Sequence, residues 1–224
     1  PGVALAFLVS DNPYTPGSWK IVLHHEDGWQ SALWSLPETL MSTEEKSLLQ
    51  GKTQSIPHDA KTFTGYKLPF PEGRKAKLSQ SIGHVLIYKT CPSTCLYAFD
   101  FWDGTMFPVS AARGGVVKKA IWEFPNGNTT NTNYLLIEDT STSPTTYQIY
   151  YHLAQDSIPP ALRVPGAAVR QGQFIGNADD TGASTAHHLP FMVHTNPSSY
   201  WGTSVDITFD EVSMNGGRPR TCIE

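Results

Sequence analysis

The chain has 224 residues, enough for one large domain with a full hydrophobic core and a smaller extension. Its formal net charge of -4 excludes the basic surface of a nucleic-acid-binding protein and the polybasic segment of a membrane anchor. No uninterrupted apolar run approaches the roughly 20 residues that a membrane-spanning helix needs.

Residues 1–65 predict a small N-terminal α+β module with a connector. The apolar run 3–9 favours an opening strand, with a signal-peptide remnant as the alternative. A second strand is expected over 19–25, followed by a turn at Asp27-Gly28, and the capping pattern at 42–46 indicates a short helix. His24 and His25 face opposite ways on a strand, so they are surface histidines rather than a metal-binding pair.

Residues 66–224 predict a mainly β domain. Charged residues make up only 16% of the chain, and 18 glycines and 17 prolines break it into short segments. Strands are expected at 82–88, 96–101, 106–110, 114–122, 133–139, 145–151, 173–176 and 188–194. With almost no helical periodicity, this spacing predicts an antiparallel β-sandwich or half-barrel.

The three cysteines cannot all pair within one chain. Cys91 and Cys95 flank three residues, so a disulfide between them would close the tip of a hairpin, and free thiols are the alternative. The compartment decides between the two, because disulfides persist in oxidising surroundings. A metal site lacks a second thiolate pair, and Cys222 lies alone near the end of the sequence.

Two segments near the C-terminus carry a resemblance. The first reads Val-Arg-Gln-Gly-Gln-Phe-Ile-Gly over 169–176, and the second reads Asp-Thr-Gly-Ala-Ser-Thr-Ala-His-His-Leu-Pro-Phe over 180–191. They resemble V-K-x-G-Q-x-I-G and N-T-G-x-S-T-G-x-H-L-H-F of the lysostaphin-type zinc endopeptidases, which cut peptide bridges in bacterial cell walls. Residues 68–73 and 97–117 are also similar to family segments.

This resemblance implies the β fold of these peptidases for residues 66–224, with zinc as cofactor. It also implies a secreted or cell-envelope protein whose partner is cell-wall peptide or peptidoglycan. In the family, two histidines and one aspartate bind zinc, while two further histidines act as base and oxyanion stabiliser.

The resemblance assigns the aspartate ligand to Asp100, for which hydrogen bonds to backbone amides are the structural alternative. The histidine expected four residues earlier is replaced by Leu96, and the nearest candidate is His84. We expect His84 to lie beside Asp100 across a hairpin tipped by Cys91 and Cys95. A strand histidine satisfied by hydrogen bonds is the competing interpretation.

His152 matches the family's Y-x-H-L and His188 the first histidine of H-L-H, so both are predicted catalytic residues in one groove with Asp100. The second histidine of H-L-H, a zinc ligand, is Pro190 here. Proline has no lone pair for a metal and no amide for the strand ladder. Neither His187 nor His194 replaces it, since His187 faces the other way and His194 lies further along the strand.

Three functions follow as hypotheses. The first is a zinc endopeptidase acting on cell-wall peptides through an impaired metal site. The second is an inactive relative that binds a peptide, glycan or protein in the groove. In the third, the N-terminal module covers the groove as an inhibitor or scaffold. The number of metal ligands distinguishes the first two, and Pro190 predicts weak or absent zinc.

Overall fold

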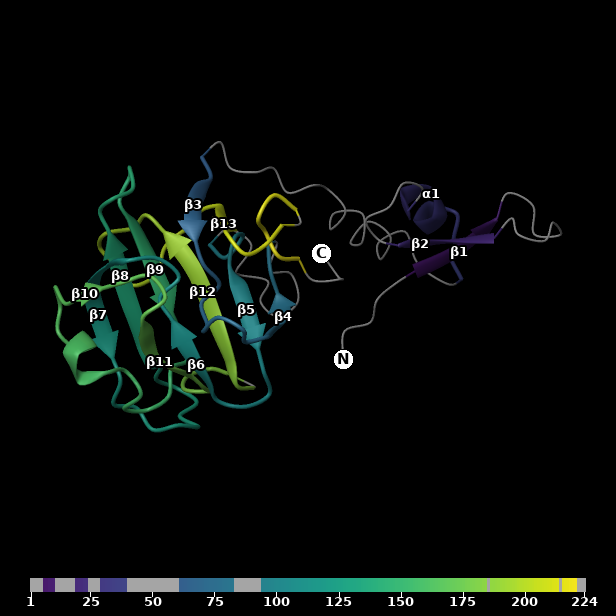
Figure 1. Cartoon of the computed structure of the whole chain (residues 1–224). Coiled ribbons are helices and arrows are strands. Elements are labelled where there is room, and N and C mark those ends of the chain that lie inside the picture. The colour runs from purple at the N-terminus through teal and green to yellow at the C-terminus, as the bar shows by residue number, and fades with distance from the viewer. Residues whose placement is uncertain are drawn as a thin grey trace. The chain divides into compact units, whose positions relative to one another are not determined.

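The structure is a computed structural model that describes residues 6–10, 19–23, 29–39, 61–82, 94–184, 186–213 and 215–220. The chain divides into two compact units (Figure 1). One comprises Pro1–Pro57 with Thr221–Glu224, and the other comprises His58–Arg220. The boundary expected between residues 65 and 66 falls within the strand β3 (Phe63–Tyr66) of the larger unit.

The smaller unit contains an antiparallel hairpin and one short helix. Strand β1 (Ala6–Ser10) pairs with β2 (Trp19–Leu23), close to the two strands expected there. Helix α1 (Trp29–Trp34) was not predicted; its Leu33 is fully buried. The helix expected after residue 42 lies outside the described residues.

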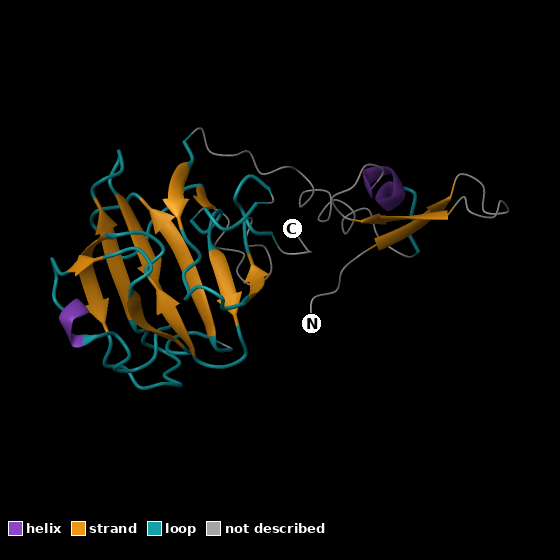
Figure 2. Cartoon of the chain, in the orientation of Figure 1, coloured by secondary structure: helices purple, strands orange, loops and turns teal. Residues whose placement is uncertain are grey.

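A seven-stranded sheet dominates the larger unit, and all of its neighbouring strands are antiparallel (Figure 2). Its order is β10 (Ala168–Val169), β7 (Gly115–Ile121), β8 (Tyr134–Asp139), β9 (Thr146–Tyr150), β12 (His188–His194), β5 (Phe99–Trp102) and β4 (Lys77–Gln80). Strand β12 is therefore central, with β9 on one side and β5 on the other.

Smaller elements complete this unit. Strand β11 (Phe174–Ala178) pairs antiparallel with β6 (Phe107–Ser110), and β13 (Ile207–Phe209) pairs parallel with β3. The 3-10 helix η1 is Pro160–Leu162. The predicted mainly β, antiparallel fold is confirmed. Within the described residues, no helix is long and apolar enough to cross a membrane.

One face of the large sheet packs through aromatic rings. Phe209 of β13 lies edge-on to Phe99 of β5, with ring centroids 5.1 Å apart, and Phe101 lies at 6.2 Å from it. Phe191 of β12 contacts Tyr150 of β9 at 5.1 Å. Because side chains alternate along a strand, residues 99 and 101 enter this core while residue 100 points the other way.

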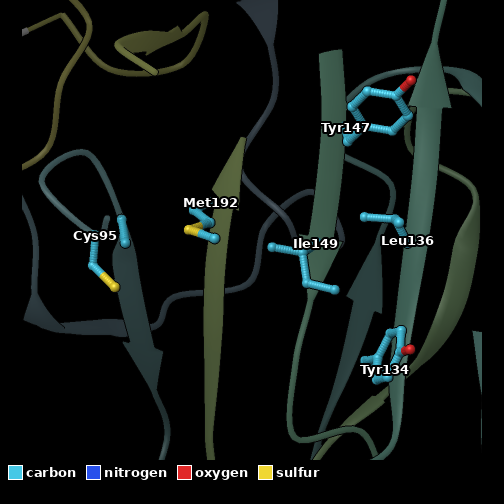
Figure 3. Close-up of a cluster of buried hydrophobic side chains, with 7 residues drawn as sticks. Cys95, Tyr134, Leu136, Tyr147, Ile149 and Met192 are labelled. Atoms are coloured by element: carbon cyan, nitrogen blue, oxygen red, sulfur yellow. The ribbon is translucent and has the colours of Figure 1, made fainter. Parts of the chain in front are cut away.

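The opposite face carries a second apolar cluster, drawn in Figure 3. Its buried members are Cys95, Ala98, Tyr134, Leu136, Tyr147, Ile149 and Met192. Both faces of β8 and β9 are therefore covered, which explains why all five residues of β9 are buried. Strands buried on both faces show continuous apolar character instead of strict alternation.

A buried ion pair connects segments far apart in the sequence. The Arg218 guanidinium donates to both carboxylate oxygens of Asp206, from Nε at 2.7 Å and from Nη2 at 2.6 Å. Thr62 Oγ1 donates to the same carboxylate at 2.8 Å. The side chains of Arg218 and Asp206 are only 8% and 0% exposed, so each charge depends on the other for solvation.

We expect Arg218→Ala to lower the free energy of unfolding by about 3–5 kcal/mol, because it leaves the Asp206 carboxylate buried without its main cation. Lys118→Ala is the matched control. It breaks a surface ion pair with Glu138 and should cost less than about 1 kcal/mol. Urea denaturation measures both, and equal losses in the two variants would contradict the prediction.

Candidate functional site

His152 occupies an unusual backbone position just after β9. Its φ is +54°, in the left-handed region that non-glycine residues rarely adopt. The surrounding structure holds it there: the His152 carbonyl accepts a hydrogen bond from the Asp179 amide at 2.7 Å. A strained conformation kept in place by its neighbours is typical of functional positions.

The His152 ring is fixed by the segment that follows β11. Its Nδ1 lies 2.5 Å from the Thr181 carbonyl oxygen, which can only accept a hydrogen bond. The proton of the neutral ring is therefore on Nδ1, and the lone pair is on Nε2. Thr181 is itself held, because its Oγ1 donates to the Leu153 carbonyl at 2.8 Å.

Gly182 makes this arrangement possible. Its φ is +95°, and a Cβ there would lie 1.8 Å from Thr132 Oγ1. Only glycine allows so close an approach with this backbone conformation. The Thr-Gly pair of the sequence motif thus has a physical role, since it delivers a carbonyl to the ring of His152.

His188, the first residue of β12, lies beside His152. The two ring centroids are 4.9 Å apart and the ring planes are inclined by 53°. His188 Nδ1 is 2.8 Å from the Ala186 carbonyl, so the neutral form of this ring also has its proton on Nδ1 and its lone pair on Nε2. Ser184 Oγ lies 3.2 Å from the same nitrogen.

The electrostatics keep His152 neutral. Burial, and to a lesser extent the neighbouring His188, lower the pKa of His152 to about 4, while the Thr181 carbonyl and Asp180 oppose the shift. His152 is only 6% exposed, so its charged form would be poorly solvated. At neutral pH it offers an uncharged imidazole that accepts hydrogen bonds through Nε2.

Asp100 lies on the strand next to these histidines. Strand register pairs Asp100 with Pro190 of β12 on one side and with Gln80 of β4 on the other. Gln80 Nε2 donates to Asp100 Oδ2 at 2.9 Å. His188 and Pro190 share one face of β12, so this register places Asp100 on the same face of the sheet as His188.

These residues do not fit the zinc centre implied by the resemblance. Pro190 has no donor atom for a metal, and the amide of Gln80 already binds one oxygen of Asp100. Within the described residues, Asp100 is in no group of three or more His, Cys, Asp or Glu side chains close enough to share an ion. His84, its predicted partner, lies outside the described residues.

The two histidines set aside in the sequence have other contacts. His187 Nδ1 lies 2.5 Å from Asp179 Oδ1, and the fully buried His194 stacks on Tyr147 with centroids 5.5 Å apart. Cys95 is disulfide-bonded. Its predicted partner Cys91 lies outside the described residues, as does Cys222, so the Cys91–Cys95 bridge stays a prediction.

Aromatic side chains extend from the histidine pair in both directions. Tyr151 contacts the edge of His152, with centroids 5.0 Å apart, and stacks on Tyr200 at 6.2 Å. On the other side, strand register pairs His188 with Trp102. Trp102 and Tyr200 are 37% and 40% exposed, so each end of this row reaches solvent.

Sequence reasoning missed three residues of the site. Gln80 precedes the strand that was expected at 82–88, and no motif marks it. Thr181 lay inside the recognised motif, but only the fold shows that its carbonyl binds His152. Asp179 was not singled out in the sequence, and here it is 1% exposed.

Comparisons with known proteins agree with this description. Residues 97–201 match the model of peptidase family M23. A search of curated proteins found no match.

Several solved structures are similar. A zinc-containing peptidase from Vibrio cholerae is 28% identical over 59% of this chain and 36% of that chain, with a TM-score of 0.39. The catalytic domain of lysostaphin from Staphylococcus simulans is 27% identical over 63% and 84%, with a TM-score of 0.36. A SpoIIIAH–SpoIIQ complex matches at 18% identity over 63% and 96%, with a TM-score of 0.43. This chain thus spans about a third of the Vibrio cholerae protein.

We expect the His152 ring to titrate with a midpoint near pH 4, since burial and His188 lower its pKa to about 4. The unfolded chain binds that proton at about pH 6.5, so the domain loses stability as the pH falls from about 6.5 to about 4. NMR of the histidine Cε1 protons measures the midpoint, with His152→Gln to assign the signal. A midpoint at or above pH 6.5 would refute the burial argument.

Proposed function

Because residues 97–201 match the model of peptidase family M23, we propose that this domain binds bacterial cell-wall peptides on the surface around His152 and His188. We further propose that its metal centre at Asp100 is impaired, so that hydrolysis is slow or absent. The observation that carries the proposal is the pair of fixed imidazoles beside Pro190, where a third metal ligand would be required.

The chemistry of the histidine pair favours peptide recognition. Backbone carbonyls hold both Nδ1–H groups, which orients the rings and leaves the Nε2 lone pairs as acceptors for peptide N–H groups. An orientation fixed before binding reduces the entropy lost when a ligand associates. The exposed Trp102 and Tyr200 on either side supply apolar area for the flanking parts of such a ligand.

The surroundings of Asp100 support the impaired metal centre. With Pro190 in the ligand position, the proposed first shell is His84 and Asp100, two ligands where catalytic zinc sites have three. Two protein ligands bind zinc weakly and do not fix the geometry that acidifies its water. We therefore assign His152 and His188, the catalytic positions of the family, to ligand binding in this chain.

The proposed location is secreted or within the cell envelope, where peptidoglycan is accessible. The disulfide at Cys95 supports this, because disulfides persist in oxidising compartments and are rare in the cytosol. Proposed partners are cell-wall peptide or peptidoglycan.

Binding is tested by co-sedimentation of the full chain with purified peptidoglycan. We expect Trp102→Ala and His188→Ala to weaken binding roughly threefold to tenfold, because each removes a contact of the proposed surface. The matched control is Phe174→Ala, an equally exposed aromatic residue on β11, which should bind like the unmodified chain. Equal affinity for all four proteins would overturn the proposed surface.

The metal argument predicts that Pro190→His raises zinc affinity at Asp100 by more than about 100-fold, because losing an outer-shell partner alone changes affinity by about 10–100-fold. Asp100→Asn in the same protein should abolish the gain, which ties the added zinc to this position. Equilibrium dialysis with zinc measures both. Rapid cleavage of peptidoglycan peptides by the unmodified chain, lost on Asp100→Asn, would show that the centre is intact.

A further inference from the structure

A second cluster of donor groups lies at the beginning of β12, outside the surface just proposed. Asp179, Asp180 and His187 each place a potential ligand atom within 4.8 Å of the others. They are the sole group of this kind in the described part of the chain. Strand β11 ends at Ala178, so the two consecutive aspartates are released from strand alternation and can approach one another.

Asp179 provides independent evidence for a bound ion. It is 1% exposed, and its Oδ2 is buried without a hydrogen-bond partner among the described residues. Its Oδ1 pairs with His187 Nδ1 at 2.5 Å. An ionised carboxylate with one unsatisfied, buried oxygen is costly unless a proton or a cation lies there.

The neighbouring Asp180 strengthens this requirement. The potential ligand atoms of Asp179 and Asp180 lie within 4.8 Å of each other, so the two carboxylates are close neighbours. Two ionised carboxylates have no hydrogen to donate to each other, so either a shared proton or a metal ion must relieve their repulsion. Asp180 Oδ1 accepts from the Gly127 amide at 2.8 Å, which positions the carboxylate at the cluster.

We propose that Asp179, Asp180 and His187 bind a divalent transition-metal ion of the zinc and manganese class. Two carboxylates and one imidazole form a mixed oxygen and nitrogen donor set, which suits these ions better than Mg²⁺ or Ca²⁺, whose ligands are oxygen atoms. This site is separate from Asp100 and Pro190, and it does not depend on peptide binding.

The location gives the ion a structural role. The Asp179 amide donates to the His152 carbonyl at 2.7 Å, and the Asp179 carbonyl accepts from the His188 amide at 3.2 Å. A metal bound to Asp179 and His187 therefore ties together both ends of the segment that positions the two site histidines. The ion is expected to stabilise this segment in the native state.

The experiment uses the full chain, first stripped with a chelator and then dialysed against zinc, manganese, magnesium or calcium. We expect one equivalent of zinc or manganese per chain, with much weaker magnesium and calcium binding. Zinc at about 100 times its Kd should raise Tm by roughly 5 °C in a domain of this size. Metal content and Tm are both read without any peptide ligand.

Two conservative variants test the assignment. Asp180→Asn keeps an oxygen for the Gly127 amide, and His187→Gln changes a partly exposed ring. Each should weaken metal binding by more than about 100-fold, because the loss of an outer-shell partner alone costs about 10–100-fold. The matched control is Asp156→Asn, an exposed aspartate outside both sites, which should bind zinc like the unmodified chain.

Three results would overturn the site. One is the absence of tight metal binding in the unmodified chain. Another is zinc that persists in Asp180→Asn and His187→Gln but disappears in Asp100→Asn, which places the ion at the family position. The third is an Asp180→Asn variant that is more stable than the unmodified chain without any metal uptake, which shows that the two carboxylates share a proton.

Discussion

The register of β12 determines most of what this domain can do. The strand lies between β9 and β5, and its even-numbered residues share one face. Along that face, the ring of His188 packs against that of His152, and Pro190 is paired by register with Asp100. Met192, further along the same face, belongs to the second apolar cluster. The odd-numbered residues, such as Phe191, fill the aromatic core on the other side. A shift by one residue would exchange the two faces, so the core and the histidine pair require the same register.

At this site, backbone carbonyls fix the tautomers of the two histidines, a role that carboxylate side chains have in many other sites. Neither site histidine relies on a carboxylate to choose its tautomer, because Thr181 and Ala186 each present a carbonyl to Nδ1. A carbonyl cannot become a donor, so the choice does not change with protonation of a neighbour. The cost is conformational: His152 adopts a left-handed backbone, and Gly182 must remain glycine.

The mainly β fold could be predicted from short segments separated by turn residues, because these are local signals. The positions around the D-T-G motif came from the resemblance to the peptidase family. Contacts across the sheet are not local. Gln80 contacts Asp100 through strand pairing between residues twenty apart, and no sequence pattern near Gln80 predicts this contact. The parallel pairing of β13 with β3 is a still longer contact, and the short β13 has no distinctive composition. Asp179 could not be predicted for another reason: its importance comes from its burial, which the sequence around it does not indicate.

The pairing of Arg218 with Asp206 and Thr62 has a topological consequence. Arg218 Nη2 lies 3.1 Å from Thr62 Oγ1, so the first and last described segments of the larger unit meet at one point. Such a domain can be circularly permuted: a short linker could join these ends while new termini open in an exposed loop. In such a permuted chain, the strands would follow one another in a different order along the sequence but would pair in the same sheet.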